Sequence, residues 1–173
     1  MTEQDQQHDV VGIGNALVDV LSQEDDSFLD RFGLTKGAMD LIDTARAEQL
    51  HTAMSDVREA SGGSAANTLA GVASFGGRAA FIGRVHHDDL GASFGHDLSA
   101  NGVRFVSEPT TDGDPTGRCL IVVTPDAQRT MNPYLGAAAA LGPGQLDAGV
   151  IARAKVTYLE GYLFDPAPAR EPV

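Results

Sequence analysis

The fold is indicated most clearly by residues 61–85, which read SGGSAANTLAGVASFGGRAAFIGRV. Gly62 and Gly63 allow a close backbone approach or a positive φ, and the small residues after them let a helix lie close against a sheet. The second Gly-Gly pair precedes the apolar run RAAFIGRV, which predicts a strand. These residues therefore predict a loop, a helix and a strand, and we expect the loop to open onto a binding site.

Strands and helices are expected to alternate around this stretch. The β-branched run Val10–Leu21 predicts one central strand buried on both faces, and apolar runs at 103–108 and 155–165 predict further strands. Thr44 can cap a helix, and residues 89–100 predict another. The helix after the first Gly-Gly pair is expected to bury a face formed by Leu69, Val72 and Phe75. This alternation is typical of a parallel α/β sheet.

A different pattern follows at residues 116–138, where two strands joined by a turn at Pro125-Asp126 predict a hairpin. The mixed segment 27–43 favours short strands or a flap over a long helix. Together these two segments could form a small sheet that covers one end of the molecule.

Composition limits the possible classes of function. The 173 residues suffice for one domain, in which residues 1–9 are expected to be a disordered tail. A net charge of −12 argues against nucleic acid or an anionic membrane as partner. The single cysteine, Cys119, excludes an intrachain disulfide, and because the start is polar we expect no signal peptide. We expect a cytoplasmic protein, cut short within a larger pattern because it ends on the proline-rich PAPAREPV.

Asp19 is a candidate ligand-binding residue. We expect it at the carboxyl end of a central strand, where open α/β sheets bind ligands. Its carboxylate either accepts hydrogen bonds from two vicinal sugar hydroxyls or caps a helix or turn. The preceding Gly12 and Gly14 match two positions of a dinucleotide fingerprint, but Leu17 stands at the third and weakens that interpretation.

Other polar residues have two interpretations each. Gly62, Gly63 and Asn67 either present polar groups at a helix start or only pack that helix closely on the sheet. Glu160 is expected at a strand end, either buried with a partner or at an exposed turn. Arg129 is either a site residue or a solvated charge on an edge strand.

The histidines His86, His87 and His96 show no metal-ligand spacing. Cys119 is expected to be a buried, inert thiol. Ser61 and Ser64 have no evident base nearby in the sequence, so nucleophilic catalysis is not expected.

The chain resembles the N-terminal half of the PfkB or ribokinase-like family of carbohydrate and nucleoside kinases over residues 10–165. The resemblance rests most on GGSAANTLAGVASFGGRAAFIGRVHHDDLG. GNALVD, PDAQRTMNPYLGA and YLEGYLFD resemble the adenosine-kinase-like branch in particular. It implies a three-layer α/β/α sandwich with a small β-sheet lid, truncated on its C-terminal side, with lid segments at about 22–43 and 115–136. Dimers through the lid are common in that family.

The same resemblance implies a site for a small-molecule sugar or nucleoside. The residues that it implies are Asn15, Asp19, Gly62, Gly63, Asn67, Arg129 and Glu160. The family usually has VGDDxxG after its IGR strand, whereas this chain has His86 and His87 in the first Gly-Asp positions and keeps Asp88 and Gly91. We therefore expect an altered turn there.

The family's catalytic aspartate lies in a GAGD loop that also forms the anion hole, and an Asn-x-x-Glu motif organises Mg²⁺. Neither motif occurs in this sequence, so no catalytic or metal-binding residue is expected in this chain, and ATP and Mg²⁺ are implied only for a complete enzyme. The first hypothesis is the substrate-binding half of an ATP-dependent sugar or nucleoside kinase that transfers the γ-phosphoryl group to a primary hydroxyl. The alternative is a non-catalytic sugar-binding or dimerisation module.

Overall fold

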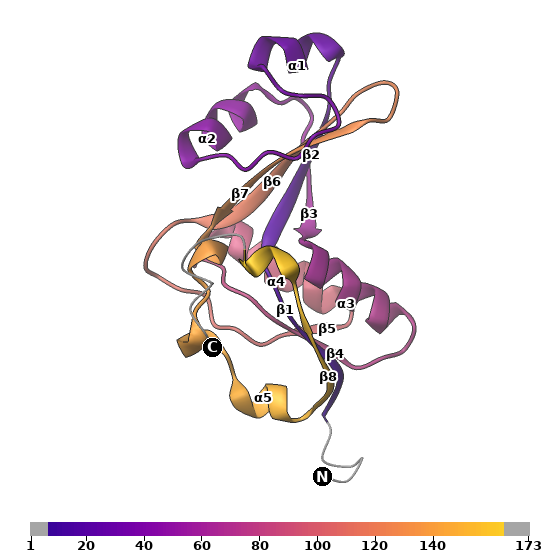
Figure 1. The fold of residues 1–173 in the computed structure, drawn as a ribbon, viewed down its shortest axis with the longest axis vertical. Coiled ribbons are helices and arrows are strands. Elements are labelled where there is room, and N and C mark those ends of the chain that lie inside the picture. Colours follow the sequence, from indigo (N-terminus) through magenta and orange to yellow (C-terminus); the bar gives the residue numbers. More distant parts are fainter. Residues whose placement is uncertain (1–6, 165–173) are drawn as a thin grey trace.

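A computed structural model of the chain describes residues 7–164, and within them the strands form two four-stranded sheets (Figure 1). The strands are β1 (His8–Ile13), β2 (Leu17–Gln23), β3 (Arg58–Gly62), β4 (Ala79–Ile82), β5 (Val103–Phe105), β6 (Thr116–Val123), β7 (Arg129–Gly136) and β8 (Ala154–Leu159). The α-helices are α1 (Asp26–Phe32), α2 (Thr44–Ala53), α3 (Ser64–Ser74), α4 (Asp89–Ala100) and α5 (Ala148–Ala152). Short 3₁₀ helices are η2 (Ala137–Ala140), η3 (Pro143–Gln145) and η4 (Gly161–Phe164).

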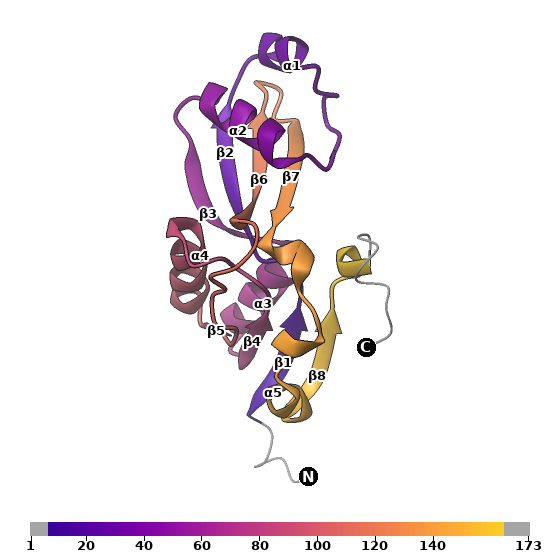
Figure 2. The same cartoon turned by 90° about the vertical axis from the view of Figure 1, so that its left-hand side faces the viewer.

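The first sheet has the order β5-β4-β1-β8 and all its pairs are parallel. On one face, Phe81 of β4 packs with Leu69 of α3 and Phe94 of α4 in the main core. On the other face, Val11 of β1 and Val150 of α5 belong to a smaller cluster. Helices therefore cover both faces, as a parallel sheet requires, and the predicted α/β class is confirmed (Figure 2).

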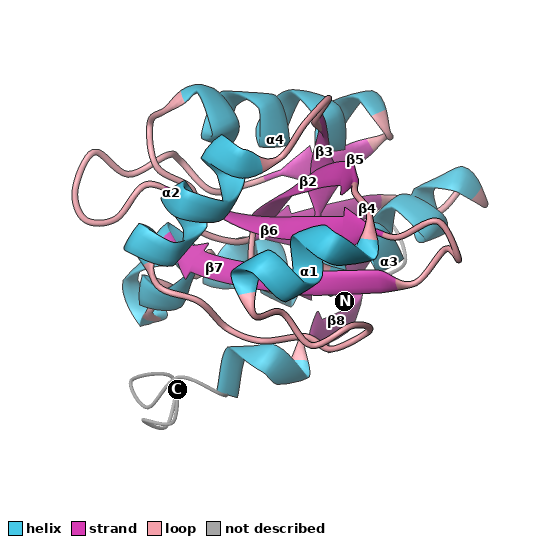
Figure 3. Cartoon of the chain, turned by 90° about the horizontal axis from the view of Figure 1, so that it is seen from above, coloured by secondary structure: helices cyan, strands magenta, loops and turns pink. Residues whose placement is uncertain are grey.

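The second sheet has the order β3-β2-β6-β7 and stands at one end of the first (Figure 1). Helices α1 and α2 cover its outer face (Figure 3). Side chains alternate between the two faces of a strand, and Val18, Val20, Leu120 and Val122 pack into the core with these helices. The residues that alternate with these, including Asp19, face the opposite side of the sheet. The β6–β7 hairpin confirms the prediction for residues 116–138.

The sequence prediction of one strand over Val10–Leu21 is wrong. The run divides at residues 14–16 into β1, in the first sheet, and β2, in the second. Asp19 consequently lies in the middle of β2, where it pairs with Ala60 and Cys119, and not at the end of a central strand.

Three local predictions also need correction. The expected tail 1–9 is too long, because His8 is buried in β1, while residues 1–6 lie outside the described residues. Asp43, not Thr44, caps α2 by accepting from the Arg46 N–H at 2.8 Å. Phe75 is 94% exposed, because α3 ends at Ser74 and its C-cap no longer follows the buried helix face.

The expected lid segments match the second sheet only in part. Residues 115–136 supply β6 and β7, but segment 22–43 folds mainly as α1 and a strap, which we define as residues 38–42. The strap follows the outer edge of β7, with Met131 N–H donating to the Ala38 carbonyl at 2.9 Å and Asp40 N–H donating to the Met131 carbonyl at 3.1 Å. Strands β2 and β3 complete the sheet.

Asp88 joins the two parts of the molecule. Its side chain caps α4 by accepting from the Gly91 N–H at 2.8 Å, and it also accepts from the N–H and Oγ1 of Thr116, the first residue of β6, at 2.8 and 2.6 Å. The preceding histidine turn packs on Thr110, whose carbonyl accepts from the His87 N–H at 2.8 Å. Burial acts to raise the pKa of Asp88, but the hydrogen bonds from Thr116 and Gly91 outweigh it, so the pKa is lowered.

We expect Asp88→Ala to lower the free energy of unfolding by about 1–2 kcal/mol at neutral pH, the usual effect of losing a helix cap. Because the folded pKa lies below the unfolded one, the contribution is present above the unfolded pKa and is lost as pH falls through the folded pKa. Urea unfolding of this variant and of Asp114→Ala, an exposed loop control, checks both statements. Equal stability of the two variants at neutral pH would contradict the role of Asp88 in joining α4 to β6.

Candidate functional site

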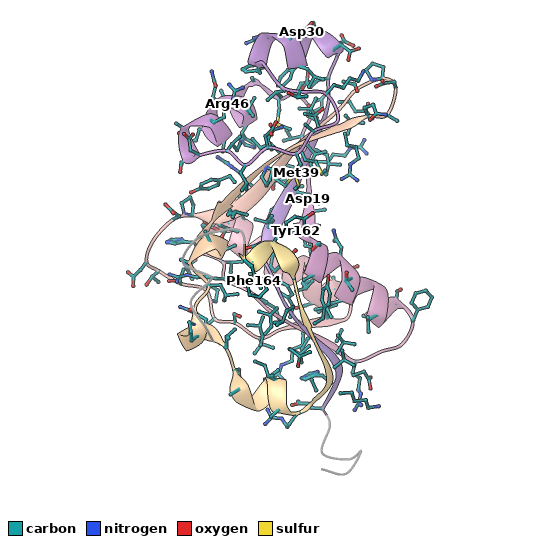
Figure 4. All side chains as sticks on the ribbon, viewed as in Figure 1. Asp19, Asp30, Met39, Arg46, Tyr162 and Phe164 are labelled. Atoms are coloured by element: carbon teal, nitrogen blue, oxygen red, sulfur yellow. The ribbon has the colours of Figure 1, made fainter. Side chains whose placement is uncertain are left out.

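A cavity of about 290 Å³ lies where the two sheets meet, at the lower end of the range of roughly 300–1,000 Å³ typical of small-molecule sites. Strands β2, β6 and β7, the strap, the start of α3 and the residues after β8 contribute its walls. Asp19, Met39 and Tyr162 come from three of these elements and lie around the junction of the two sheets (Figure 4).

Most of the residues predicted for the site are brought together here, although they are far apart in the sequence. Those that line the cavity are Asn15, Asp19, Gly63, Asn67, Arg129 and Glu160. Gly62 is not part of the lining. It packs against the carboxylate of Asp19 from the neighbouring strand β3, its partner strand in the second sheet.

The Gly-Gly pair makes room for two of these residues. A Cβ at Gly62 would collide with the Asp19 carboxylate. Gly63 has a φ of 92° at the N-cap of α3, where a Cβ would also collide with the carbonyl oxygen of Asn15. Both positions therefore require glycine, and the pair brings the start of α3, with Asn67 in its second turn, against Asn15 and Asp19.

Asp19 has the electrostatic features of a binding group. Burial raises the pKa of its carboxyl, and the Arg129 guanidinium opposes that shift only in part. Among the described residues, no side chain or backbone donor is placed on this carboxylate, so both oxygens can accept hydrogen bonds from a ligand. An unpaired carboxylate in a largely apolar cavity is costly unless a ligand supplies the donors.

Glu160 links three segments of the chain at the site. It follows β8, is 2% exposed, and accepts from the Asn15 N–H at 2.5 Å and from the Ser64 hydroxyl. Its own N–H donates to the Ile13 carbonyl at 3.0 Å. Glu160 thus ties the β1–β2 turn, the start of α3 and the end of β8 into one unit, and its carboxylate positions neighbouring groups.

Apart from Ser64, the remaining walls are apolar. The side chains that form them are Leu17, Met39, Leu41, Cys119, Ile121, Met131, Pro133, Leu135 and Tyr162. The strap holds Met39 and Leu41 in place through its backbone hydrogen bonds to β7, including one from the Ile42 N–H to the Pro133 carbonyl at 3.0 Å.

Most of these wall residues were not predicted from the sequence. A signal was available, because positions 17 and 19, 119 and 121, and 129 to 135 alternate with period two on one face of their strands. Cys119 was expected to be a buried, inert thiol; it does line the cavity, but burial and the nearby Asp19 raise its pKa to about 12, so it stays protonated at neutral pH.

Over residues 7–164, no group of three or more His, Cys, Asp and Glu side chains is arranged to hold a metal ion. In the same part of the chain, no helix has both the length and the apolar character needed to span a membrane.

The known proteins that this chain matches in sequence and in structure are kinases. Residues 27–171 match the family model described as pfkB family carbohydrate kinase. The chain is 53% identical to adenosine kinase from Sinorhizobium meliloti, with a TM-score of 0.88 over 95% of this chain and 50% of that one. It is 52% identical to a probable sugar kinase from Rhizobium etli, with a TM-score of 0.87 over 93% and 49% of the two chains.

A curated relative, probable fructokinase-3 from Arabidopsis thaliana, is 31% identical over 114 residues, which are 65% of this chain and 33% of the relative. The chain thus spans about half the length of these solved structures and a third of this relative.

Proposed function

This chain belongs to the pfkB family of carbohydrate kinases, and on that premise we propose that it forms the acceptor-binding part of an ATP-dependent kinase. The complete enzyme transfers the γ-phosphoryl group of ATP to a primary hydroxyl. The sequence holds neither a GAGD loop nor an Asn-x-x-Glu motif, and the described residues include no metal-binding group. We therefore assign no step of the phosphoryl transfer to the described residues.

The acceptor that fits the cavity best is a nucleoside. The observation that supports this is the division of the cavity into a polar end, with Asp19, Asn67 and Asn15, and apolar walls from the strap, β6 and β7. The carboxylate of Asp19 can accept hydrogen bonds from two vicinal ribose hydroxyls, and Asn67 can both donate and accept. A flat aromatic base suits the apolar walls, whereas a free sugar would leave them in contact with water.

Calorimetric titration of the purified chain with adenosine, ribose and fructose tests this proposal. We expect adenosine to bind nearly a hundredfold tighter than ribose, because burying about 100 Å² of base surface contributes about 2.5 kcal/mol. Leu41→Ala should weaken adenosine binding and leave ribose binding unchanged. Val57→Ala is the matched control, since Val57 is an exposed apolar residue outside the cavity.

Two outcomes would contradict the proposal. Equal affinity for ribose and adenosine would indicate a free sugar as acceptor. Absence of binding by all three compounds would show that this chain alone does not form the site.

A single, buried cysteine suits the reducing cytoplasm, where we place the enzyme. Dimerisation through the second sheet stays a prediction. The surface available for it includes the edge strand β3, where Arg58, Glu59 and Ala60 are exposed.

A further inference from the structure

The cavity extends across the second sheet from its polar end to the strap. Asp19 stands on β2, and strands β6 and β7 separate it from the strap, which holds Met39 (Figure 4). At about 4.8 Å between neighbouring strands, roughly 14 Å lies between β2 and the strap. A nucleoside whose ribose hydroxyls bind Asp19 therefore places its base over β6 and β7, toward Met39 and Leu41.

The side chains around this base position offer few hydrogen bonds. The lining residues of β6, β7 and the strap are Met39, Leu41, Cys119, Ile121, Arg129, Met131, Pro133 and Leu135. The thiol of Cys119 is only a weak donor, and the charge of Arg129 acts on Asp19 at the polar end. Of the described lining residues outside that end, Tyr162 alone carries a further side chain that forms strong hydrogen bonds.

The backbone of this wall is already paired. Strand β6 pairs with β2 on one side and with β7 on the other. On the outer edge of β7, the strap takes the N–H and carbonyl of Met131 and the carbonyl of Pro133, and proline has no N–H of its own. These groups lie in the plane of the sheet, whereas the base lies against its face. The wall therefore contacts the face of the base and not its edge.

The base end of the cavity is open to water. Met39, Leu41 and Tyr162 line it and are 48%, 60% and 50% exposed. A base held among them can keep its polar edge in water. A closed apolar wall would instead remove water from that edge without replacing the lost hydrogen bonds, which is costly.

We infer that this site recognises the ribose and the flat faces of the base and does not read the hydrogen-bonding edge of the base. The acceptor class is then purine nucleosides with different exocyclic groups, and not adenosine alone. A site that hydrogen-bonds a substrate group rejects an analogue lacking it, because its own polar group is left unpaired. Here only Tyr162 could be left so, and its half-exposed phenol can bind water instead. The inference rests on the proposed function, because it takes a nucleoside as the ligand.

Calorimetric titration of the chain with adenosine, inosine and purine riboside tests the inference. Inosine exchanges a donor and an acceptor on the base edge, and purine riboside lacks the exocyclic amino group. We expect the three dissociation constants to agree within about fivefold, because the edge exchanges hydrogen bonds only with water. Tyr162→Ala should weaken all three by a similar factor, since it removes apolar contact with the base. Phe75→Ala, which replaces an exposed aromatic residue outside the cavity, is the control.

Two results would overturn the inference and leave the nucleoside acceptor standing. One is binding of inosine or purine riboside more than about tenfold weaker than that of adenosine, the loss expected from an unpaired group in the wall. The other is a Tyr162→Ala variant in which the ratio of adenosine to inosine affinity changes by a similar factor. If none of the three binds, or if adenosine binds no tighter than ribose, the proposed function fails and the inference fails with it.

Discussion

Asp19→Asn is expected to raise the stability of the unliganded chain at neutral pH and to weaken adenosine binding. Burial raises the pKa of Asp19 in the folded chain, so the ionised carboxylate is less favourable there than in the unfolded chain. This penalty is absent below the unfolded pKa and fully present above the folded pKa. The asparagine carries no charge and avoids it, so the gain in stability should disappear as pH falls through that window.

The effect of this variant on binding has the opposite sign. The amide offers one acceptor oxygen in place of two, and losing a hydrogen bond to a charged group removes about 1.5–3 kcal/mol, or roughly ten- to hundredfold in Kd. In the natural chain, adenosine affinity should also fall at low pH, beginning at a higher pH than for an ordinary aspartate, because protonation removes an acceptor.

Thermal unfolding and calorimetric titration of Asp19→Asn measure both effects. Asp30→Asn is the control, since Asp30 is exposed in α1 at the far end of the molecule (Figure 4). A variant with unchanged adenosine affinity, or one less stable than the natural chain at neutral pH, would contradict the role given to Asp19.

Glu160→Ala is expected to lower the free energy of unfolding by about 2–4 kcal/mol, because it leaves the buried Asn15 N–H without its acceptor and removes the bond from Ser64. Adenosine binding should weaken as well, since the β1–β2 turn and the start of α3 lose their common partner. Glu160→Gln should lose less on both measures, because its amide oxygen can still accept from Asn15.

Urea unfolding followed by adenosine titration of each variant checks this expectation. Glu108→Ala replaces an exposed glutamate and provides the control. If Glu160→Ala unfolded at the same urea concentration as Glu108→Ala, Glu160 would not join the three elements as described.

The alternation of strands and helices could be predicted because it depends on local patterns. The helix at 89–100, the strand at RAAFIGRV and the hairpin at 116–138 were each signalled by apolar spacing and by turn residues. The division of Val10–Leu21 could not be predicted in this way. Its apolar pattern continues through the turn at 14–16, and the turn depends on Glu160 and Gly63, which are distant in the sequence.

The candidate site was only half visible for the same reason. Polar residues such as Asp19 and Asn67 stood out against apolar surroundings, whereas Met131 and Leu135 resembled ordinary strand residues. Which face of β6 and β7 borders the cavity is decided by the pairing with β2 and by helices α1 and α2 on the other face. The strap confirms in part the prediction that segment 27–43 joins the hairpin, but its place on β7 could not be predicted, because these contacts join segments about 90 residues apart.

In the proposed complex, the ribose hydroxyls of a nucleoside bind the carboxylate of Asp19. The most direct test is a calorimetric comparison of adenosine with 2′,3′-dideoxyadenosine, which lacks both hydroxyls, on the natural chain and on Asp19→Asn. We expect the natural chain to prefer adenosine roughly ten- to hundredfold and the variant to show most of that preference lost. An equal preference for adenosine in both proteins would contradict the claim, because the hydroxyls would then bind elsewhere.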